Sequence, residues 1–279
     1  MSDDHKHIVL FDMDGTLTES RDIIYEQMVS ALVDLSTVPN LEIGIVTGSD
    51  YDYVKQQVAD LLDHPEVRNK LHILPCNGTK YYRFDIETES YVLLSEESMR
   101  GYLGSDKFNS VMRLLIERQS RFSYSLEDLT GHFVSYRGSM INWCPIGRNA
   151  SEQQRYEFIT MDTSYEPTLR ERELKNLNYR LSQMSLDRNL VVKLGGDTSF
   201  DIFPIGWDKT YCLRFFKDYD VWFVGDRCEE SGNDFEIYEA VNGNSQAYDT
   251  TGPRRTVDII NQIKIKILKS NYKRAPLPT

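Results

Sequence analysis

A short apolar run that ends in two carboxylates is the feature that most narrows the fold of this chain. Residues 8–11 read Ile-Val-Leu-Phe, and Asp12, Met13, Asp14 and Gly15 follow directly. A continuous apolar run of this length is typical of a strand buried on both faces, as in a parallel sheet. Such a strand rarely ends in two carboxylates unless a charged group meets them, so an ordinary acidic turn explains the pattern poorly. The run predicts an α/β sheet with a chemically active strand end.

The chain up to about residue 93 alternates between strand and helix patterns. Further strands are predicted over 43–46 and 71–74, and helices over 22–35 and after a cap at Ser49 or Asp50. This alternation favours an α/β sheet. Polar side chains follow the carboxyl ends of the strands, which is the edge at which open parallel sheets bind ligands.

The pattern changes in the middle of the chain and then returns. A hairpin is predicted around 87–89, and residues 94–202 read as a separate α+β domain. Its predicted helices are 108–119, 151–161 and 167–184, and its predicted strands are 134–136, 140–143, 190–194 and 199–203. A buried strand at 221–224 and a last helix over 253–268 resume the first pattern, before a basic, frayed tail. We therefore expect a discontinuous core, 1–93 and 203–279, with the domain 94–202 inserted.

Composition excludes several classes of protein. The 279 residues are 40% hydrophobic, a globular composition long enough for two modest domains. No apolar run reaches the ~18–20 residues that a bilayer crossing needs, and the polar N-terminus is unlike a secretory signal. A net charge of −11 argues against a nucleic-acid or anionic-membrane partner. The four cysteines form no CxxC pair, which indicates free thiols in a reducing cytoplasm. The chain contains no GxxxxGK[ST] run, so the sequence does not support a P-loop nucleotide enzyme.

A second acidic group follows the late strand. Asp226 stands at the end of that strand, and Asn233 and Asp234 come seven and eight positions later. Together with Asp12 and the backbone carbonyl of Asp14, Asp226 can complete an oxygen site of the kind that Mg²⁺ prefers. Asn233 and Asp234 can bind metal-bound water, or they can cap the following helix. A cation here would offset the repulsion between a phosphate and a nucleophilic carboxylate.

Two further polar residues have both a chemical and an ordinary interpretation. Thr47 ends the second predicted strand and can donate a hydrogen bond to a transferring phosphoryl group, or it can simply form a Thr-Gly-Ser turn. Lys209 can neutralise phosphate oxygens and steady Asp12, or it can be a solvated lysine at the start of a helix.

The inserted segment carries residues suited to a sugar phosphate. Arg137, Arg148 and Arg155 come from three neighbouring pieces and can fork onto one phosphate, although single arginines are usually surface residues. Ser199 and Asp201 alternate along a predicted strand and so share one face of it. A hydroxyl and a carboxylate on one face suit the hydroxyl groups of a sugar.

The octet from Phe11 to Thr18 resembles the first motif of the haloacid dehalogenase superfamily. In that superfamily the first aspartate attacks phosphorus and becomes an aspartyl phosphate, and the second transfers the proton. The resemblance therefore implies that Asp12 is the nucleophile and Asp14 the general acid and base, on a Rossmann-like core.

From Phe11 to about Thr251 the chain is similar to the eukaryotic-type phosphomannomutases of that superfamily, which carry an inserted α/β cap of the C2b type. This resemblance implies an isomerase of GDP-mannose biosynthesis that interconverts mannose 6-phosphate and mannose 1-phosphate. It also implies Mg²⁺, a hexose 1,6-bisphosphate intermediate and activator, and a cytoplasmic homodimer joined through the cap. The cap arginines, with Arg21 from the core, would hold the non-reacting phosphate, and Ser199 and Asp201 would contact the sugar and phosphate.

Two other functions stay open. Thr47 stands where the family usually has glycine, and the loop after Asp226 also departs from the family pattern, which favours a sugar-phosphate phosphatase on the same scaffold. A non-catalytic sugar-phosphate binding protein is the third hypothesis, but binding alone would not require both Asp12 and Asp14. The choice between mannose and glucose is not visible in the sequence.

Overall fold

The computed structural model describes residues 6–122 and 129–274, which divide into two compact units. The first unit contains the described residues up to Glu96 and from Lys209 onward, and the second contains Glu97–Asp208. The sequence placed these boundaries after residues 93 and 202. The boundaries differ because β5 (Ser90–Glu96) and β9 (Ser199–Pro204) each run to the end of their own sheet before the chain leaves it.

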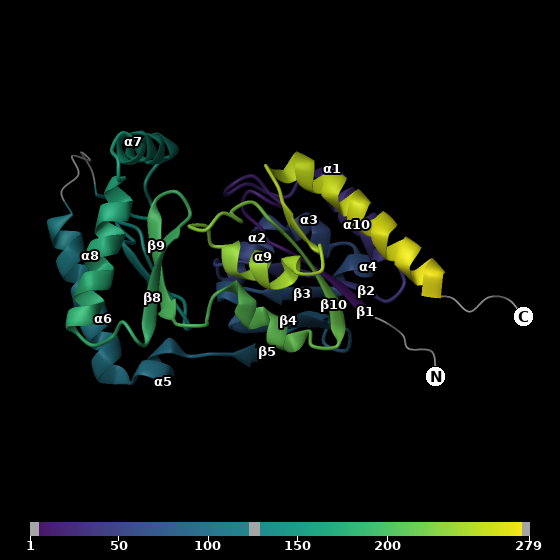
Figure 1. Cartoon of the computed structure of the whole chain (residues 1–279), viewed down its shortest axis with the longest axis horizontal. Coiled ribbons are helices and arrows are strands. Elements are labelled where there is room, and N and C mark those ends of the chain that lie inside the picture. The colour runs from purple at the N-terminus through teal and green to yellow at the C-terminus, as the bar shows by residue number, and fades with distance from the viewer. Residues whose placement is uncertain (1–5, 123–128, 275–279) are drawn as a thin grey trace, which may run out of the picture. The chain divides into compact units, whose positions relative to one another are not determined.

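A seven-stranded sheet forms the centre of the first unit (Figure 1). Its other strands are β1 (Lys6–Phe11), β2 (Leu41–Val46), β3 (Leu71–Leu74), β4 (Lys80–Asp85), β10 (Tyr219–Gly225) and β11 (Ala247–Asp249). The order is β11-β10-β1-β2-β3-β4-β5, parallel from β11 to β3 and antiparallel at the β4–β5 edge. The predicted α/β sheet is confirmed. The three-residue β11 was not predicted, because its residues 247–249 form neither an apolar run nor one arm of a recognisable hairpin.

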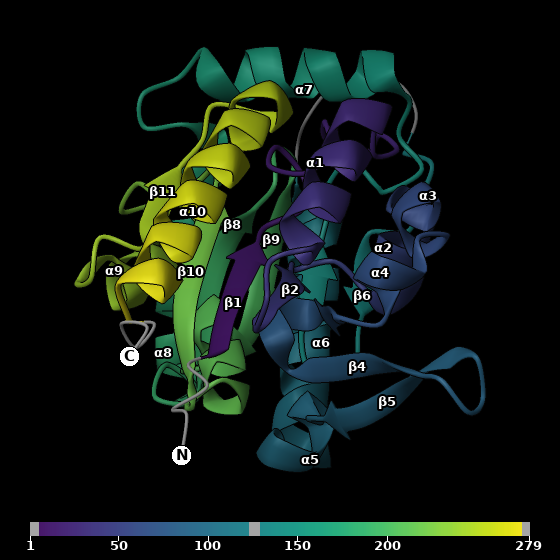
Figure 2. The same ribbon diagram turned by 90° about the vertical axis from the view of Figure 1, so that its right-hand side faces the viewer.

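Helices cover both faces of this sheet. On one face α1 (Glu26–Ser36) and α10 (Pro253–Arg274) lie side by side (Figure 2), and α2 (Tyr51–Gln57), α3 (Ala59–Leu62) and α4 (Pro65–Arg68) pack into the same core. On the other face lie η2 (Lys209–Phe215) and α9 (Phe235–Asn242), and η1 (Cys76–Gly78) packs against η2.

Strand β1 is buried on both faces, as its apolar run predicted. Val9 and Phe11 enter the core under α1 and α10, whereas Ile8 and Leu10 enter the core on the opposite face. Helix α10 continues past the predicted end at residue 268, so the predicted frayed tail is wrong up to Arg274. The rest of that tail, 275–279, lies outside the described residues.

The second unit is an α+β unit with a four-stranded antiparallel sheet in the order β6-β7-β9-β8. Its other elements are β6 (Val134–Tyr136), β7 (Ile141–Trp143), β8 (Leu190–Gly195), α5 (Met99–Leu103), α6 (Ser105–Arg121), α7 (Glu152–Thr163) and α8 (Leu169–Gln183). Helices α5, α6 and α8 share an apolar core with one face of the sheet, where Trp143 stacks on Phe200. On the other face, Asp201 pairs in register with Asn142 and Lys193. This second face is therefore polar.

A buried polar cluster in the first unit provides a test of stability against pH. Glu42 Oε2 lies 2.6 Å from His72 Nε2, and it accepts hydrogen bonds from Arg83 Nη1 at 3.2 Å and Tyr219 Oη at 2.9 Å. Burial alone would raise the pKa of Glu42, but these partners outweigh it and lower the pKa from 4.5 to about 2. A carboxylate with a lowered pKa stabilises the fold above pH 4.5, and this stabilisation disappears as the pH falls toward 2.

We expect Glu42→Gln to be less stable than the wild type at pH 7 and to lose less stability between pH 4.5 and 2. Denaturant unfolding across this range measures the effect. Glu87→Gln, in the exposed hairpin turn, is the matched control. Equal slopes of stability against pH for Glu42→Gln and the wild type would contradict the assignment.

Among residues 6–122 and 129–274, no helix combines the length and the apolar character needed to cross a bilayer.

Candidate active site

The predicted nucleophile lies at the carboxyl edge of the central sheet. Strand β1 lies between β10 and β2, and Asp12 extends it by donating its backbone N–H to Val224 of β10 at 2.9 Å. Asp226 follows β10 and Thr47 follows β2, so both stand at this edge. The parallel direction of the strands brings these polar residues together from distant parts of the sequence.

Lys209 is buried in the middle of this group. Its side chain is 1% exposed, and its ammonium donates to the carboxylates of Asp12 and Asp234, the latter at 2.5 Å. Burial disfavours the ammonium, but attraction to the two carboxylates outweighs it and raises the pKa of Lys209 above 10.5. The alternative of a solvated lysine is therefore wrong, and Lys209 carries its charge at neutral pH.

Three carboxylates lie together at this edge, two of them in contact with Lys209. Asp12, Asp226 and Asp234 each offer an oxygen within 4.8 Å of the others. Burial raises the pKa of Asp12, and the charges of Asp234 and Asp226 add to this shift while Lys209 opposes it. Burial and Asp234 also raise the pKa of Asp226. When all three carboxylates are ionised, the single positive charge of the buried ammonium does not neutralise them. The group therefore has a net negative charge and favours binding of a further cation.

The loop that precedes α9 supplies further oxygen atoms. Asn233 Oδ1 is buried and makes no hydrogen bond within the described chain. The side chain of Asp234 does not cap α9; it accepts hydrogen bonds from Lys209 and, at 3.2 Å, from the backbone N–H of Arg227. The helix-capping alternative is thus wrong for Asp234. Carboxylate and amide oxygens are the donors that Mg²⁺ prefers, so the donor set fits the predicted metal.

Gly15 lets the first motif approach Asp226. It has φ of +83°, and a Cβ at this position would lie 2.3 Å from Asp226 Oδ2. We expect Gly15→Ala to lower kcat for the predicted phosphoryl transfer to Asp12 by about 100-fold. The added methyl group must displace Asp226, and an alanine is strained at the positive φ of this position. Gly243→Ala is the matched control, since a Cβ there meets no atom within 4 Å. Steady-state kinetics of both variants would contradict the prediction if they gave equal kcat values.

Asp14, the predicted acid and base, accepts its hydrogen bonds from residues outside the group of Lys209 and its carboxylates. Its Oδ1 accepts hydrogen bonds from the Tyr53 hydroxyl at 2.8 Å and from the backbone N–H of Arg21 at 3.0 Å. Tyr53 was missed in the sequence, where nothing distinguished it from other helical tyrosines. Thr47 is buried, and its Oγ1 accepts the N–H of Ser49 at 3.2 Å.

In the second unit, two predicted site residues, Arg148 and Asp201, are joined through an asparagine that was not predicted. Arg148 Nη1 donates to Asn142 Oδ1 at 3.1 Å, and Asn142 Nδ2 donates to Asp201 Oδ1 at 2.7 Å. Asn142 was missed, although its register opposite Asp201 in neighbouring strands explains the contact. The polar face of the sheet therefore carries a connected cation, amide and carboxylate.

The other predicted site residues of this unit have different partners. Arg155 is buried, and it donates to the backbone oxygen of Arg148 at 2.8 Å and to Thr198 Oγ1 at 3.1 Å. Ser199 is buried at the start of β9. Arg137 follows β6 and pairs its N–H with the carbonyl of Met140. Arg155 thus braces the turn that contains Arg148.

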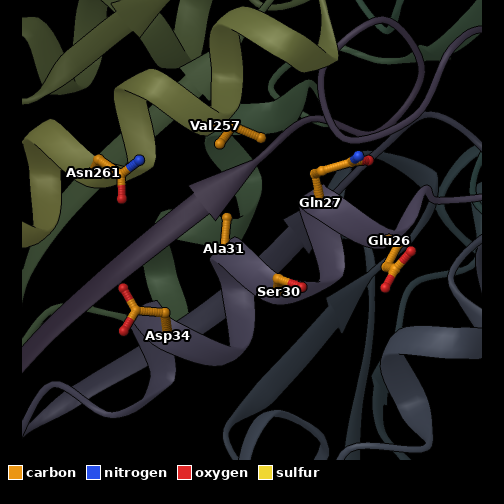
Figure 3. Close-up of a pocket in the computed structure, with 7 residues that line it drawn as sticks. All are labelled: Glu26, Gln27, Ser30, Ala31, Asp34, Val257 and Asn261. Carbon is orange, nitrogen blue, oxygen red and sulfur yellow. The ribbon is translucent and has the colours of Figure 1, made fainter.

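A groove of about 480 Å³ between α1 and α10 lies apart from the predicted site residues (Figure 3). Its lining is Glu26, Gln27, Ser30, Ala31, Asp34, Val257 and Asn261. These residues include two carboxylates and no cationic side chain, so the groove does not suit a phosphate.

Comparison with known proteins identifies the family. Residues 30–266 match the sequence profile of eukaryotic phosphomannomutase. The chain belongs to the eukaryotic phosphomannomutase family. It is 37% identical over 245 residues to a phosphomannomutase of Encephalitozoon cuniculi, covering 85% of this chain and 86% of that protein. It is 32% identical over 263 residues to phosphomannomutase 1 of Dictyostelium discoideum, covering 93% and 97%. The predicted family and enzyme class are confirmed.

Solved structures support the fold of this phosphomannomutase family member. The structure of Plasmodium falciparum IMP-nucleotidase aligns with a TM-score of 0.66 at 14% identity, covering 96% of this chain and 65% of that one. A trehalose-6-phosphate phosphatase of Aspergillus fumigatus aligns with a TM-score of 0.52 at 14% identity, covering 94% and 93%. At such identities the likeness concerns the fold alone. The predicted fold class, an α/β core with a mostly parallel sheet and an added α+β unit, is confirmed.

Proposed function

We propose that this enzyme interconverts mannose 6-phosphate and mannose 1-phosphate through an aspartyl phosphate on Asp12 and a hexose 1,6-bisphosphate intermediate. The observation that carries the proposal is the buried ion pair between Lys209 and Asp12, at the sheet edge of a chain that belongs to this family. The ammonium fixes one oxygen of the nucleophile and attracts the phosphate that it attacks.

The transfer then uses two carboxylates. An oxygen of Asp12 forms a bond to phosphorus, the bond between phosphorus and the sugar oxygen breaks, and Asp14 gives its proton to that oxygen. In the second half, a free hydroxyl of a sugar monophosphate forms a bond to the phosphorus of the aspartyl phosphate, the bond between phosphorus and Asp12 breaks, and Asp14 takes the proton of that hydroxyl. The bisphosphate formed in this way then presents its other phosphate to Asp12, and the first half repeats. Lys209 keeps its charge through the cycle because its pKa is raised.

Mg²⁺ would bind where the oxygen atoms gather. Its proposed ligands are Asp12, Asp226, the backbone carbonyl of Asp14 and, directly or through water, Asn233 and Asp234. When bound, the ion offsets the repulsion between the phosphate and the carboxylates. The buried Asn233 Oδ1, which makes no hydrogen bond within the described residues, supports this assignment.

The non-reacting phosphate needs a second set of cations. We assign it to Arg137, Arg148 and Arg155 of the inserted domain and to Arg21 of the core, because guanidinium groups bind phosphate in a bidentate manner. Ser199 and Asp201 would contact the sugar and its phosphate, on the polar face of the sheet described above. The proposed domain division is a core of 1–93 and 203–279 with 94–202 inserted, and the two compact units, which divide within a few residues of these bounds, support it.

The enzyme's setting is part of the proposal. Helices α6, α7 and α8 expose Ile116, Tyr156 and Tyr179, which are 61%, 68% and 63% exposed, and these apolar groups support a homodimer through the inserted unit. None of the four cysteines, all of them among the described residues, forms a disulfide, which supports a cytoplasmic location. The net charge of −11 supports small anionic substrates held by local cations rather than a nucleic acid or a membrane.

A sugar-phosphate phosphatase is the second candidate, favoured by Thr47, which stands buried at the phosphoryl edge where the family usually has glycine. Both candidates use Asp12 and Asp14, and they differ in whether water reaches the aspartyl phosphate.

Phosphorus NMR separates the two functions. The protein is incubated with mannose 1-phosphate, Mg²⁺ and a catalytic amount of glucose 1,6-bisphosphate. Mannose 6-phosphate with little inorganic phosphate is the expected result. Stoichiometric inorganic phosphate without the 6-phosphate would establish the phosphatase instead. A parallel incubation with glucose 1-phosphate measures the sugar preference.

A further inference from the structure

We propose that Tyr53 is a positioning residue for the proton-transferring carboxylate: it holds Oδ1 of Asp14, so that Oδ2 exchanges the proton with the sugar oxygen. This inference rests on the proposed function of Asp14 and adds a residue that the sequence motifs did not indicate.

Two donors from separate elements meet on one oxygen of Asp14. The Tyr53 hydroxyl approaches Oδ1 from helix α2 at 2.8 Å, and the backbone N–H of Arg21 approaches it from the segment before α1 at 3.0 Å. Helix α2 is itself fixed at its start, because the side chain of Asp50 accepts the backbone N–H of Tyr53 at 3.0 Å. The tyrosine is therefore anchored at its backbone and donates at its far end.

This arrangement removes the main rotational freedom of an aspartate. The terminal torsion of an aspartate is broad and roughly two-fold, so a solvated carboxylate exchanges its oxygens readily. One donor alone permits rotation about the hydrogen bond, whereas two donors on Oδ1 define the plane and direction of the group. With Oδ1 occupied, Oδ2 is the oxygen that carries the proton.

The proposal makes the role of Tyr53 depend on the leaving group. When phosphate moves from a sugar to Asp12, the bond between phosphorus and the sugar oxygen breaks and that oxygen must receive a proton from Asp14. When phosphate moves from 4-nitrophenyl phosphate, the 4-nitrophenolate anion leaves without a proton. A misplaced Asp14 therefore slows the first transfer and not the second.

The test compares Tyr53→Phe with the wild type on both donors. We expect kcat for mannose 1-phosphate, with Mg²⁺ and glucose 1,6-bisphosphate, to fall by about 10- to 100-fold, with KM changed by less than about 2-fold. We expect the rate of 4-nitrophenol release in a single turnover to stay within about 2-fold of the wild type. A residue with only a structural role would lower both rates together.

Two further variants complete the design. Tyr51→Phe is the matched control from the same helix, since the ring of Tyr51 stacks on Tyr82 and not at Asp14. Asp14→Asn should lose the sugar reaction and keep the aryl reaction. Wild-type rates of Tyr53→Phe with the sugar, or equal losses with both donors, would overturn the inference. If the wild type releases only inorganic phosphate, the mutase proposal fails, while the contrast between sugar and aryl donors still decides the role of Tyr53.

Discussion

Replacement of Asp12 by asparagine will abolish phosphoryl transfer, with kcat reduced by at least about 10⁴-fold. The amide of asparagine is a poor nucleophile toward phosphorus, and no other carboxylate extends β1 in its place. The substitution preserves the volume of the side chain. It also removes one negative charge from the crowded group of carboxylates, whose repulsion and burial raise the pKa of Asp12. Lys209 keeps Asp234 as its partner in this variant. We therefore expect the Asp12→Asn protein to melt no lower than the wild type in the absence of metal.

This combination of lost turnover and retained stability separates the nucleophile from a structural residue. Incubation with bisphosphate labelled with ³²P should label the wild type and leave Asp12→Asn unlabelled. The exposed Asp218→Asn, in the same unit, is the control for the loss of one carboxylate. Turnover of Asp12→Asn within 10-fold of the wild type would exclude an aspartyl phosphate at this position.

Replacement of Lys209 by methionine will produce the largest loss of stability among these variants. Methionine fills a similar volume, but the carboxylates of Asp12 and Asp234 then lie buried without their shared cation. Loss of one partner from a buried ion pair costs about 3–5 kcal/mol. Because the pKa of Lys209 is raised above 10.5, the lysine is fully charged at pH 7 and loses its charge, and with it this contribution, as the pH rises beyond that value.

Denaturant unfolding at several pH values measures this effect. The difference between Lys209→Met and the wild type should shrink as the pH falls, because protonation of the carboxylates removes their repulsion. Activity should fall as well, since the nucleophile loses the donor that orients it. Lys217→Met, at an exposed position, is the control. A Lys209→Met protein within 0.5 kcal/mol of the wild type at pH 7 would mean that the ion pair contributes nothing to the fold.

The elements that the sequence predicts best are those with a continuous or periodic apolar pattern. The segment 8–11, directly before Asp12, contains no polar residue, so burial of this strand on both faces follows from its residue types alone. Asp226 is predictable for the same reason, because it ends a second such run. The parallel order of these strands then determines that their polar ends meet at one edge of the sheet.

The surroundings of individual polar side chains depend on contacts between distant segments and are less predictable. Lys209 follows an exposed-looking turn, and its burial depends on a carboxylate 197 residues away. Asn142 and Tyr53 have ordinary local sequences, and only strand register or helix phase brings them to Asp201 and Asp14. Their partners therefore become visible only in three dimensions.

The position of β1 between β10 and β2, inside its sheet, has a consequence for synthesis on the ribosome. Strand β1 is made first, yet its neighbour β10 begins only at Tyr219. At about 5–20 residues per second, the ribosome takes roughly 10–40 s to reach that strand. During this interval one edge of β1 has no partner, whereas the inserted unit, which has its own apolar core, has been synthesised in full by the end of it. Nascent chains stalled before Tyr219 should therefore be the form of this protein that chaperones bind most readily.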